Sequence, residues 1–330
     1  MPNHGNNKSR KPKIGLALSG GSGRAITHVG VLEVFKEEGI PIDYITACSS
    51  AVMIAGSYAS GTLPALKDYW LKMDKKFIFS LFELEKSGQG IFRGDKMLDW
   101  MREYMGKNFE DVYPRLGFVC SDIISKKSVT LCLGDMIKAG KASCSVPGLF
   151  EPVPWGNMLL VDGGLFSIVP TEQAREMGAD IVIGVDIAAT RYMFQKSFFP
   201  FRKAYNFIKS SLPARAYAAA HNFLDKVFTK SIDYIYYNQS DFLEEAAAEQ
   251  PGMFGILGRA MDISMQQNET RQGILESCDC LITPNVKHLG KIDLVNSKLM
   301  YEEGRRAARE AIPEIRKVID NWEWKNQYDK

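Results

Sequence analysis

Two oxygen-bearing side chains, Ser49 and Asp162, stand where predicted strands end. Ser49 directly follows the apolar run 42–47 and precedes a helical pattern over 50–60, so its hydroxyl is expected on a sharp strand-to-helix turn. Such a turn exposes the oxygen of a nucleophile, and the N-terminus of the next helix favours negative charge nearby. The position therefore suggests nucleophilic acyl transfer.

The residues around Ser49 leave another interpretation open. The usual GxSxG turn has glycine two residues before and two residues after the serine, whereas this chain has Ala47 and Ala51. Serines that precede helices are commonly plain N-caps, and Ser50 is the more natural cap of the two. The turn by itself does not decide between a nucleophile and a cap.

Asp162 closes a buried strand predicted over 158–161, and Gly163 and Gly164 follow it directly. At a strand end its carboxylate is expected at the same edge of the sheet as Ser49 and the glycine-rich loop that follows the first strand. Aspartates in this context are often only turn formers, which is the alternative for Asp162 taken alone.

A glycine-rich loop separates the first predicted strand, residues 13–18, from a helical pattern over 24–38. Its members are Gly20, Gly21, Ser22 and Gly23. Small residues in succession aim backbone N–H groups at one point, which suits an oxyanion. Arg24 either orients this loop by bonding its carbonyls or is a solvated residue of the first helical turn.

Phosphate and dinucleotide loops use the same physics, but neither fits well. No Lys-Ser/Thr pair follows the glycines, and Ile26 occupies the place of the third glycine in GxGxxG. A dinucleotide oxidoreductase is further disfavoured because no acidic residue ends the second strand.

Alternating strand and helix patterns predict an α/β fold with three layers, in which helices cover both faces of a mostly parallel central sheet. We expect one domain over 13–330, preceded by a disordered polar tail over 1–12. Further strands are predicted at 117–121, 129–133, 158–161, 181–186 and 280–283, and further helices at 135–142, 171–177 and 298–318.

The segment 190–258 interrupts this alternation with a long aromatic stretch that is predicted to be a helical insertion. Excursions of this length are typical of caps, lids or docking elements. Over 191–209, aromatic residues interleave with lysine and arginine, which suits peripheral contact with an anionic bilayer. A cap whose aromatics pack on the domain explains the pattern equally well. A second apolar patch, 77–82, either lines an acyl pocket or belongs to the core.

Composition narrows the class of protein. Lys plus Arg number 41 and Asp plus Glu 39, so the net charge of +2 gives no case for a nucleic-acid partner. The first dozen residues lack the apolar stretch of a secretory signal, which predicts a cytoplasmic protein that could lie against the inner face of the membrane. The six cysteines lack CxxC spacing and indicate reduced, buried thiols without a metal site. No cofactor is expected.

Four motifs in order resemble the patatin-like phospholipase family, especially its small bacterial members. They are LSGGSGRAITHVGVL, IDYITACSSAVMIAG, KASCSVPGLFEPV and LLVDGGLFSIVP, and together they cover about 13–186. The resemblance implies a patatin-like fold, Ser49 as the nucleophile, Asp162 as the base acting on it, and the loop 20–23 as the oxyanion hole. Arg24, Gly163 and Gly164 are expected to support this site without taking part in the reaction. No histidine takes part, and His28 is expected to pack behind the glycine loop.

The activity that this resemblance implies is hydrolysis of acyl esters of lipids, of the phospholipase A or lysophospholipase kind, with phospholipids or other acyl esters as substrates. The chain departs from the family at Ser22, Ala25, Ala47 and Ala51, where glycine is usual. Two alternatives therefore stay open. One is a weak or inactive protein of the same fold that binds lipids or partners, and the other is an acyltransferase that uses the same two residues.

Overall fold

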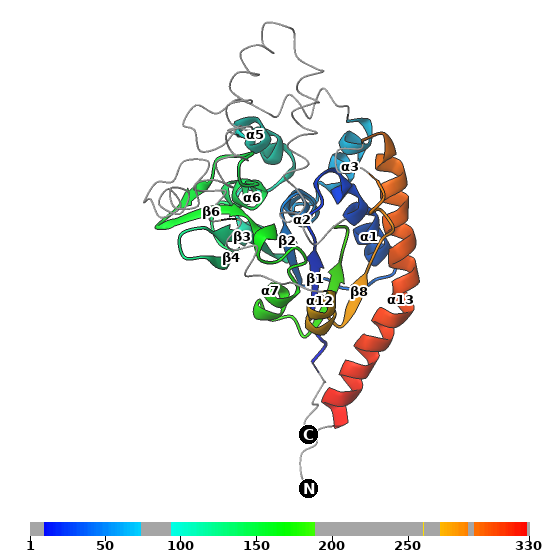
Figure 1. The fold of residues 1–330 in the computed structure, drawn as a ribbon. Helices are drawn as coiled ribbons and strands as arrows, with labels where there is room; N and C mark the ends of the chain where they lie inside the picture. The colour runs from blue at the N-terminus through cyan, green and yellow to red at the C-terminus, as the bar shows by residue number, and fades with distance from the viewer. Residues whose placement is uncertain (1–9, 74–93, 189–259, 261–270, 290–293, 329–330) are drawn as a thin grey trace, which may run out of the picture.

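An eight-stranded sheet forms the centre of the computed structural model, which describes residues 10–73, 94–188, 260, 271–289 and 294–328 (Figure 1). The strand order is β5-β6-β3-β2-β1-β7-β8, and β4 pairs with β3. The strands are β1 (Ile14–Leu18), β2 (Tyr44–Cys48), β3 (Arg115–Asp122), β4 (Lys127–Leu131), β5 (Val153–Trp155), β6 (Met158–Asp162), β7 (Ile181–Val185) and β8 (Cys280–Ile282). The predicted insertion 190–258 and the apolar patch 77–82 lie outside the described residues.

The expected mostly parallel sheet is confirmed. The pairs β1–β2, β1–β7, β2–β3 and β7–β8 are parallel. The pairs β3–β4, β3–β6 and β5–β6 are antiparallel, so the reversed strands gather at one side of the sheet. This antiparallel side carries Asp162, and the parallel side carries the glycine loop.

Helices cover both faces of the sheet, as the sequence predicted. The helices are α1 (Ile26–Glu37), α2 (Ala51–Ala59), α3 (Leu63–Lys72), α5 (Asp95–Tyr104), α6 (Met136–Cys144), α7 (Thr171–Glu176), α12 (Arg271–Ser277) and α13 (Ser297–Tyr328). Short 3-10 helices are η1 (Ser22–Ala25), η2 (Phe109–Asp111), η3 (Gly163–Leu165) and η4 (Leu294–Asn296). Helices α1 and α13 lie side by side along the sheet, whereas α7 and α12 lie at the other side (Figure 1).

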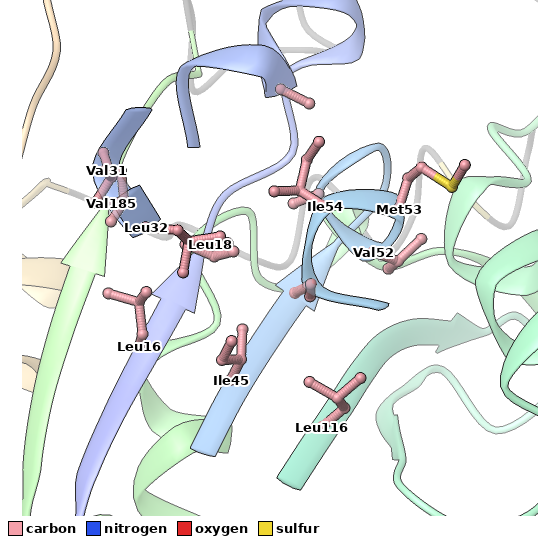
Figure 2. Packing of buried hydrophobic residues seen from close by; sticks show 14 of the residues in the cluster. Leu16, Leu18, Val31, Leu32, Ile45, Val52, Met53, Ile54, Leu116 and Val185 are labelled. Atoms are coloured by element: carbon pink, nitrogen blue, oxygen red, sulfur yellow. The ribbon is translucent and has the colours of Figure 1, made fainter. Parts of the chain in front are cut away.

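The alternation of side chains along β1 explains the two covered faces. Leu16 and Leu18 point to the face where α1 and α2 pack, and both are fully buried (Figure 2). Gly15 points to the opposite face, where a Cβ would lie 2.7 Å from the Cβ of Ala179. Large side chains thus fill one face and small ones admit α7 on the other. Each fully buried aliphatic side chain contributes about 1.5–3 kcal/mol.

Arg10, expected in the polar tail, contacts the domain, and Pro12 of the same tail is buried. The Arg10 guanidinium donates to both carboxylate oxygens of Asp180, at 2.6 and 2.8 Å, and lies 5.4 Å from the ring centroid of Trp322. Residues that contact the domain therefore begin at Arg10, three residues before the domain start that was expected at Lys13.

All six cysteines are free thiols, but they are not all buried. Cys48, Cys120 and Cys280 are buried, whereas Cys132 is exposed. The expectation of buried thiols is wrong for Cys132 because it lies just beyond β4, a strand that pairs only with β3 among the described strands. In the described part of the chain, no helix combines the length and the apolarity needed to cross a bilayer.

Candidate active site

The carboxyl ends of β2 and β6 meet on one edge of β3. Strand β3 has two edges, and β4 occupies one of them along residues 118–122. Cys48, the last residue of β2, is in register with Val119, and Asp162, the last residue of β6, is in register with Cys120. Because β2 and β6 share the remaining edge, they end against each other. The Sγ of Cys48 lies 3.9 Å from Oδ1 of Asp162.

The expectation that Asp162 reaches the Ser49 turn is consistent with this register, although the path differs from a parallel strand end. Strand β6 runs antiparallel to β3 and starts beyond the end of β2. It therefore runs back toward Ser49, and its last residue arrives next to the turn that follows β2.

The turn at Ser49 has the strained backbone expected of a nucleophile. Ser49 has a φ of 54°, in the left-handed region, where a non-glycine residue costs about 1 kcal/mol. The alanines at the two usual glycine positions, Ala47 and Ala51, are fully buried and do not prevent this conformation. Such strain persists only where surrounding contacts impose it, and it is typical of active sites.

Ser50, the competing hydroxyl, occupies the N-cap position of α2 without capping the helix through its side chain. It precedes α2, but its side chain makes no capping hydrogen bond. Its Oγ is buried and finds no hydrogen-bond partner among the residues described. Ser49 is half-buried, and it is the serine that holds the strained turn.

Asp162 is buried, with only 1% of its surface exposed. Its Oδ1 accepts the backbone N–H of Gly164 at 2.8 Å, and its main-chain carbonyl accepts the hydroxyl of Ser121 at 2.9 Å. Gly163 is required here, because a Cβ at that position would lie 2.3 Å from the carbonyl oxygen of Val119. The two glycines after Asp162 thus hold the carboxylate in place, one by its N–H and the other by its lack of a side chain.

Thiols surround the Asp162 carboxylate. Cys48 contacts it directly, and burial, together with the nearby charge of Asp162, raises the pKa of the Cys120 and Cys144 thiols well above its ordinary value. These thiols stay protonated at neutral pH and are therefore poor nucleophiles. Among the residues described, no cluster of three or more His, Cys, Asp or Glu side chains is placed to hold a metal ion.

The glycine loop lies against Ser49. A Cβ on Gly20 would lie 3.0 Å from the Ser49 Cβ, so the glycine lets the two segments approach closely without crowding. The Gly20 N–H donates to the Ile168 carbonyl at 3.2 Å, which engages that amide. This differs from the expectation that all four loop residues offer free amides. The amides of residues 21–23 remain the candidates for an oxyanion hole.

Arg24 does not orient the glycine loop through its carbonyls, nor is it solvated. It is buried at 3% exposure, and its Nε donates to the Leu289 carbonyl at 3.0 Å, where Nη2 also donates. Its Nη2 lies 3.4 Å from the Lys287 carbonyl. Arg24 thus ties the start of α1 to the segment after β8, and both expected roles are corrected.

His28 packs behind the glycine loop, as expected. Its Nε2 lies 2.8 Å from the carbonyl oxygen of Ser19, which accepts the proton and fixes the tautomer. Its Nδ1 has no hydrogen-bond partner among the described residues, and burial lowers the pKa of His28 from 6.5 to about 4. His28 is therefore neutral at physiological pH and holds the residue that leads into the loop.

We expect this histidine to make the protein acid-sensitive. A buried group with a lowered pKa contributes stability above its unfolded pKa of 6.5, and the contribution is lost as the pH falls toward 4, by about 3 kcal/mol. His28→Gln keeps an N–H donor for Ser19 but cannot titrate. Urea denaturation between pH 7 and 4 should show a steeper loss for wild type than for His28→Gln, and equal slopes would contradict the assignment.

Ser143 and Ser145 connect the two strand ends, and neither was predicted as a site residue. The N–H of Ser49 donates to Oγ of Ser143 at 2.9 Å, and the N–H of Asp162 donates to the Ser145 carbonyl at 2.9 Å. The motif KASCSVPGLFEPV contains both serines. The only sequence feature that could have drawn attention to them is the place of this motif between β4 and β6. No known spacing of residue types assigns a role to these serines.

Part of the chain is similar to known proteins. Residues 16–175 match the family model described as patatin-like phospholipase. An uncharacterized NTE family protein of Mycobacterium tuberculosis is 29% identical over 180 residues, which cover 54% of this chain and 50% of that protein. Another from Mycobacterium bovis is 26% identical over 308 residues, or 91% of this chain and 46% of its own length.

A human relative, patatin-like phospholipase domain-containing protein 6, is 28% identical over 184 residues, or 53% of this chain and 13% of the relative. The chain thus spans half or less of these relatives. The solved structure of VipD from Legionella pneumophila aligns with 91% of this chain and 67% of its own, at 12% identity and a TM-score of 0.39. Residues 16–175, slightly less than half of the 330 residues, thus resemble the patatin-like phospholipase family.

Proposed function

We propose that this protein hydrolyses acyl esters of lipids, with Ser49 as the nucleophile and Asp162 as the general base. The supporting observation is the meeting of β2 and β6 on β3, which brings the residue before Ser49 to 3.9 Å from the Asp162 carboxylate. The match of residues 16–175 to the patatin-like phospholipase family supports lipid ester hydrolysis in general, and the two residues are our assignment.

In the proposed reaction, Asp162 accepts the proton of the Ser49 hydroxyl while Oγ attacks the ester carbonyl carbon. The amides of the loop 21–23 stabilise the negative charge on the carbonyl oxygen. The carbon–oxygen bond to the alcohol breaks, and the alcohol takes the proton from Asp162. Water, deprotonated by the same carboxylate, then attacks the carbonyl carbon of the acyl-serine. The bond between that carbon and Ser49 Oγ breaks, Oγ takes the proton back from Asp162, and a fatty acid is released.

The buried position of Asp162 suits this role. Asp162 is only 1% exposed, so its carboxylate is kept from bulk water next to the turn that carries Ser49. Burial lowers the pKa of His28 from 6.5 to about 4, so its imidazole is a weaker base than an ordinary histidine.

The kind of lipid ester that the protein hydrolyses is also part of our proposal. Phospholipids and lysophospholipids are the acyl esters that we infer, since the relatives are described as patatin-like phospholipase domain-containing proteins. Contact with a membrane through 191–209 remains a prediction from the sequence, because those residues lie outside the described ranges.

Replacement of the nucleophile tests the proposal. Ser49→Ala should lower kcat on a medium-chain p-nitrophenyl ester by about a thousandfold or more and abolish labelling by a fluorophosphonate, which reacts with activated serines. Ser49→Gly should be equally inactive but more stable by about 1 kcal/mol, because glycine adopts the positive φ without strain. Ser50→Ala is the matched control and should keep its activity.

Three outcomes would contradict the assignment or favour an alternative. Activity that survives Ser49→Ala would exclude Ser49 as the nucleophile. A wild type that neither hydrolyses esters or phospholipids nor reacts with the fluorophosphonate would favour a binding protein. Transfer of the acyl group to an added alcohol in preference to water, seen by product analysis, would identify an acyltransferase.

A further inference from the structure

The end of α6 touches the main chain of both proposed catalytic residues. Ser143 lies in its last turn, and Ser145 follows the helix directly. The N–H of Ser49 donates to the Ser143 hydroxyl, and the N–H of Asp162 donates to the Ser145 carbonyl, each at 2.9 Å. One three-residue segment therefore contacts two strand ends that are far apart in sequence.

The Ser143 hydroxyl acts as both a hydrogen-bond donor and a hydrogen-bond acceptor. Its Oγ donates to the main-chain carbonyl of Val119 at 2.7 Å and accepts the N–H of Ser49. The Ser143 side chain is completely buried. A hydroxyl donates once and can accept as well, so Ser143 joins β3 to the turn after β2 at the point where the sheet ladder between them ends.

The hydrogen bonds of Ser143 connect Val119 to Ser49, which is the residue with the strained backbone. With a φ of 54°, Ser49 departs from the β2 geometry, and its N–H then has no strand position opposite it, because β3 pairs with β6 from Cys120 onward. The Ser143 hydroxyl supplies the missing acceptor. A buried N–H without one would cost about 1–3 kcal/mol, which favours relaxation of the turn.

We propose that Ser143 is a positioning residue: its hydroxyl holds the Ser49 turn in the left-handed conformation, while the adjacent Ser145 carbonyl fixes the main chain of Asp162, so that the end of α6 sets the separation of the two groups. This inference rests on the proposed function. Small errors in the position of reacting groups reduce rates strongly, since a shift of about 1 Å can cost about a hundredfold.

The test compares Ser143→Ala with Ser57→Ala. Ser57 lies on α2, is completely buried and donates to the Ile54 carbonyl at 3.2 Å, so its loss removes a comparable buried hydroxyl away from the site. Ester hydrolysis and the rate of fluorophosphonate labelling are measured at a temperature where both variants are folded. We expect Ser143→Ala to lower kcat and the labelling rate by about 10- to 100-fold with KM nearly unchanged. Ser57→Ala should keep wild-type kcat.

A conservative variant and a crystal structure separate positioning from folding. Ser143→Thr keeps the hydroxyl and should restore most of the kcat that Ser143→Ala loses. In the Ser143→Ala crystal structure, φ of Ser49 should leave the left-handed region. If that angle is unchanged and kcat stays within about twofold of the Ser57→Ala value, a difference below about 0.4 kcal/mol, the proposal is wrong.

An inactive wild type would refute the proposed function without deciding the role of Ser143. In that case, hydrogen exchange of the Ser49 amide gives the answer. Faster exchange in Ser143→Ala than in Ser57→Ala supports the bridge, whereas equal protection in both variants overturns it.

Discussion

Asp162→Asn is expected to lower kcat on ester substrates by about a thousandfold while the protein stays folded, because an amide cannot accept the Ser49 proton. The side chains have the same shape, and the amide oxygen can still accept the Gly164 N–H, which lies 2.8 Å from Oδ1. The main-chain bonds of Asp162 to Ser121 and Ser145 do not involve the carboxylate. Thermal unfolding and steady-state kinetics on the same preparation would measure both effects.

Asp186→Asn provides the matched control. Asp186 is another buried aspartate at a strand end, directly after β7, and its Oδ1 accepts the N–H of Ala188 at 3.0 Å. Its Oδ2 pairs with Lys287 at 3.2 Å, so this variant loses an ion pair but not the proposed base. We expect lower stability and near wild-type kcat. Substantial activity in Asp162→Asn, or equal losses in both variants, would show that Asp162 is not the base.

Gly304→Ala is expected to destabilise the fold by about 3 kcal/mol or more. Helix α13 lies against α1, and a Cβ at Gly304 would lie 2.0 Å from the carbonyl oxygen of Thr27. Gly30 is the reciprocal contact, where a Cβ would lie 2.2 Å from the carbonyl oxygen of Tyr301. Main-chain atoms cannot yield as a flexible side chain can, so the helices must separate. Urea denaturation of the variant would measure the loss.

The control for this prediction is Gly140→Ala in α6. A Cβ there meets Met101, with its sulfur at 3.2 Å, and a methionine side chain can move aside. Alanine is the better helix former by about 1 kcal/mol, so the change should be small or stabilising. Equal destabilisation by Gly140→Ala and Gly304→Ala would contradict the main-chain clash as the cause.

The close contact of α1 and α13 also matters to the site. Helix α1 follows the glycine loop, and its residue His28 holds the carbonyl of Ser19, which precedes that loop. A shift of α1 would therefore move the loop relative to Ser49. We expect Gly304→Ala to lose activity at temperatures below its unfolding transition, because the loop shifts before the domain melts.

Local patterns predicted the elements that carry the site. The apolar run before Ser49 is β2, the glycine loop follows β1, and Asp162 ends β6. These assignments succeeded because short buried strands bounded by small residues have a strong local signal. Helix α3 was not predicted, although Leu66 and Trp70 have helical spacing and are buried.

Contacts between distant segments were not predictable in the same way. Arg24 was assigned to the glycine loop or to solvent, whereas it bonds the carbonyls of Lys287 and Leu289. The amide of Gly20 was expected to face an oxyanion, whereas it donates to Ile168. In both cases the partner comes from a part of the chain whose arrival at that point no local pattern encodes.

The sequence by itself determined which residue types end the strands, and therefore that a hydroxyl, a carboxylate and a glycine loop were available. Only the tertiary structure decided that the strand ends that carry Ser49 and Asp162 lie together. Cys48 and Asp162 are 114 residues apart in sequence, and they come together because β6 reverses onto the edge of β3 that β2 leaves vacant. The same applies to Ser143, whose role follows from where α6 ends. Strand pairing is a long-range choice made by packing of the whole sheet, so it has no local signature.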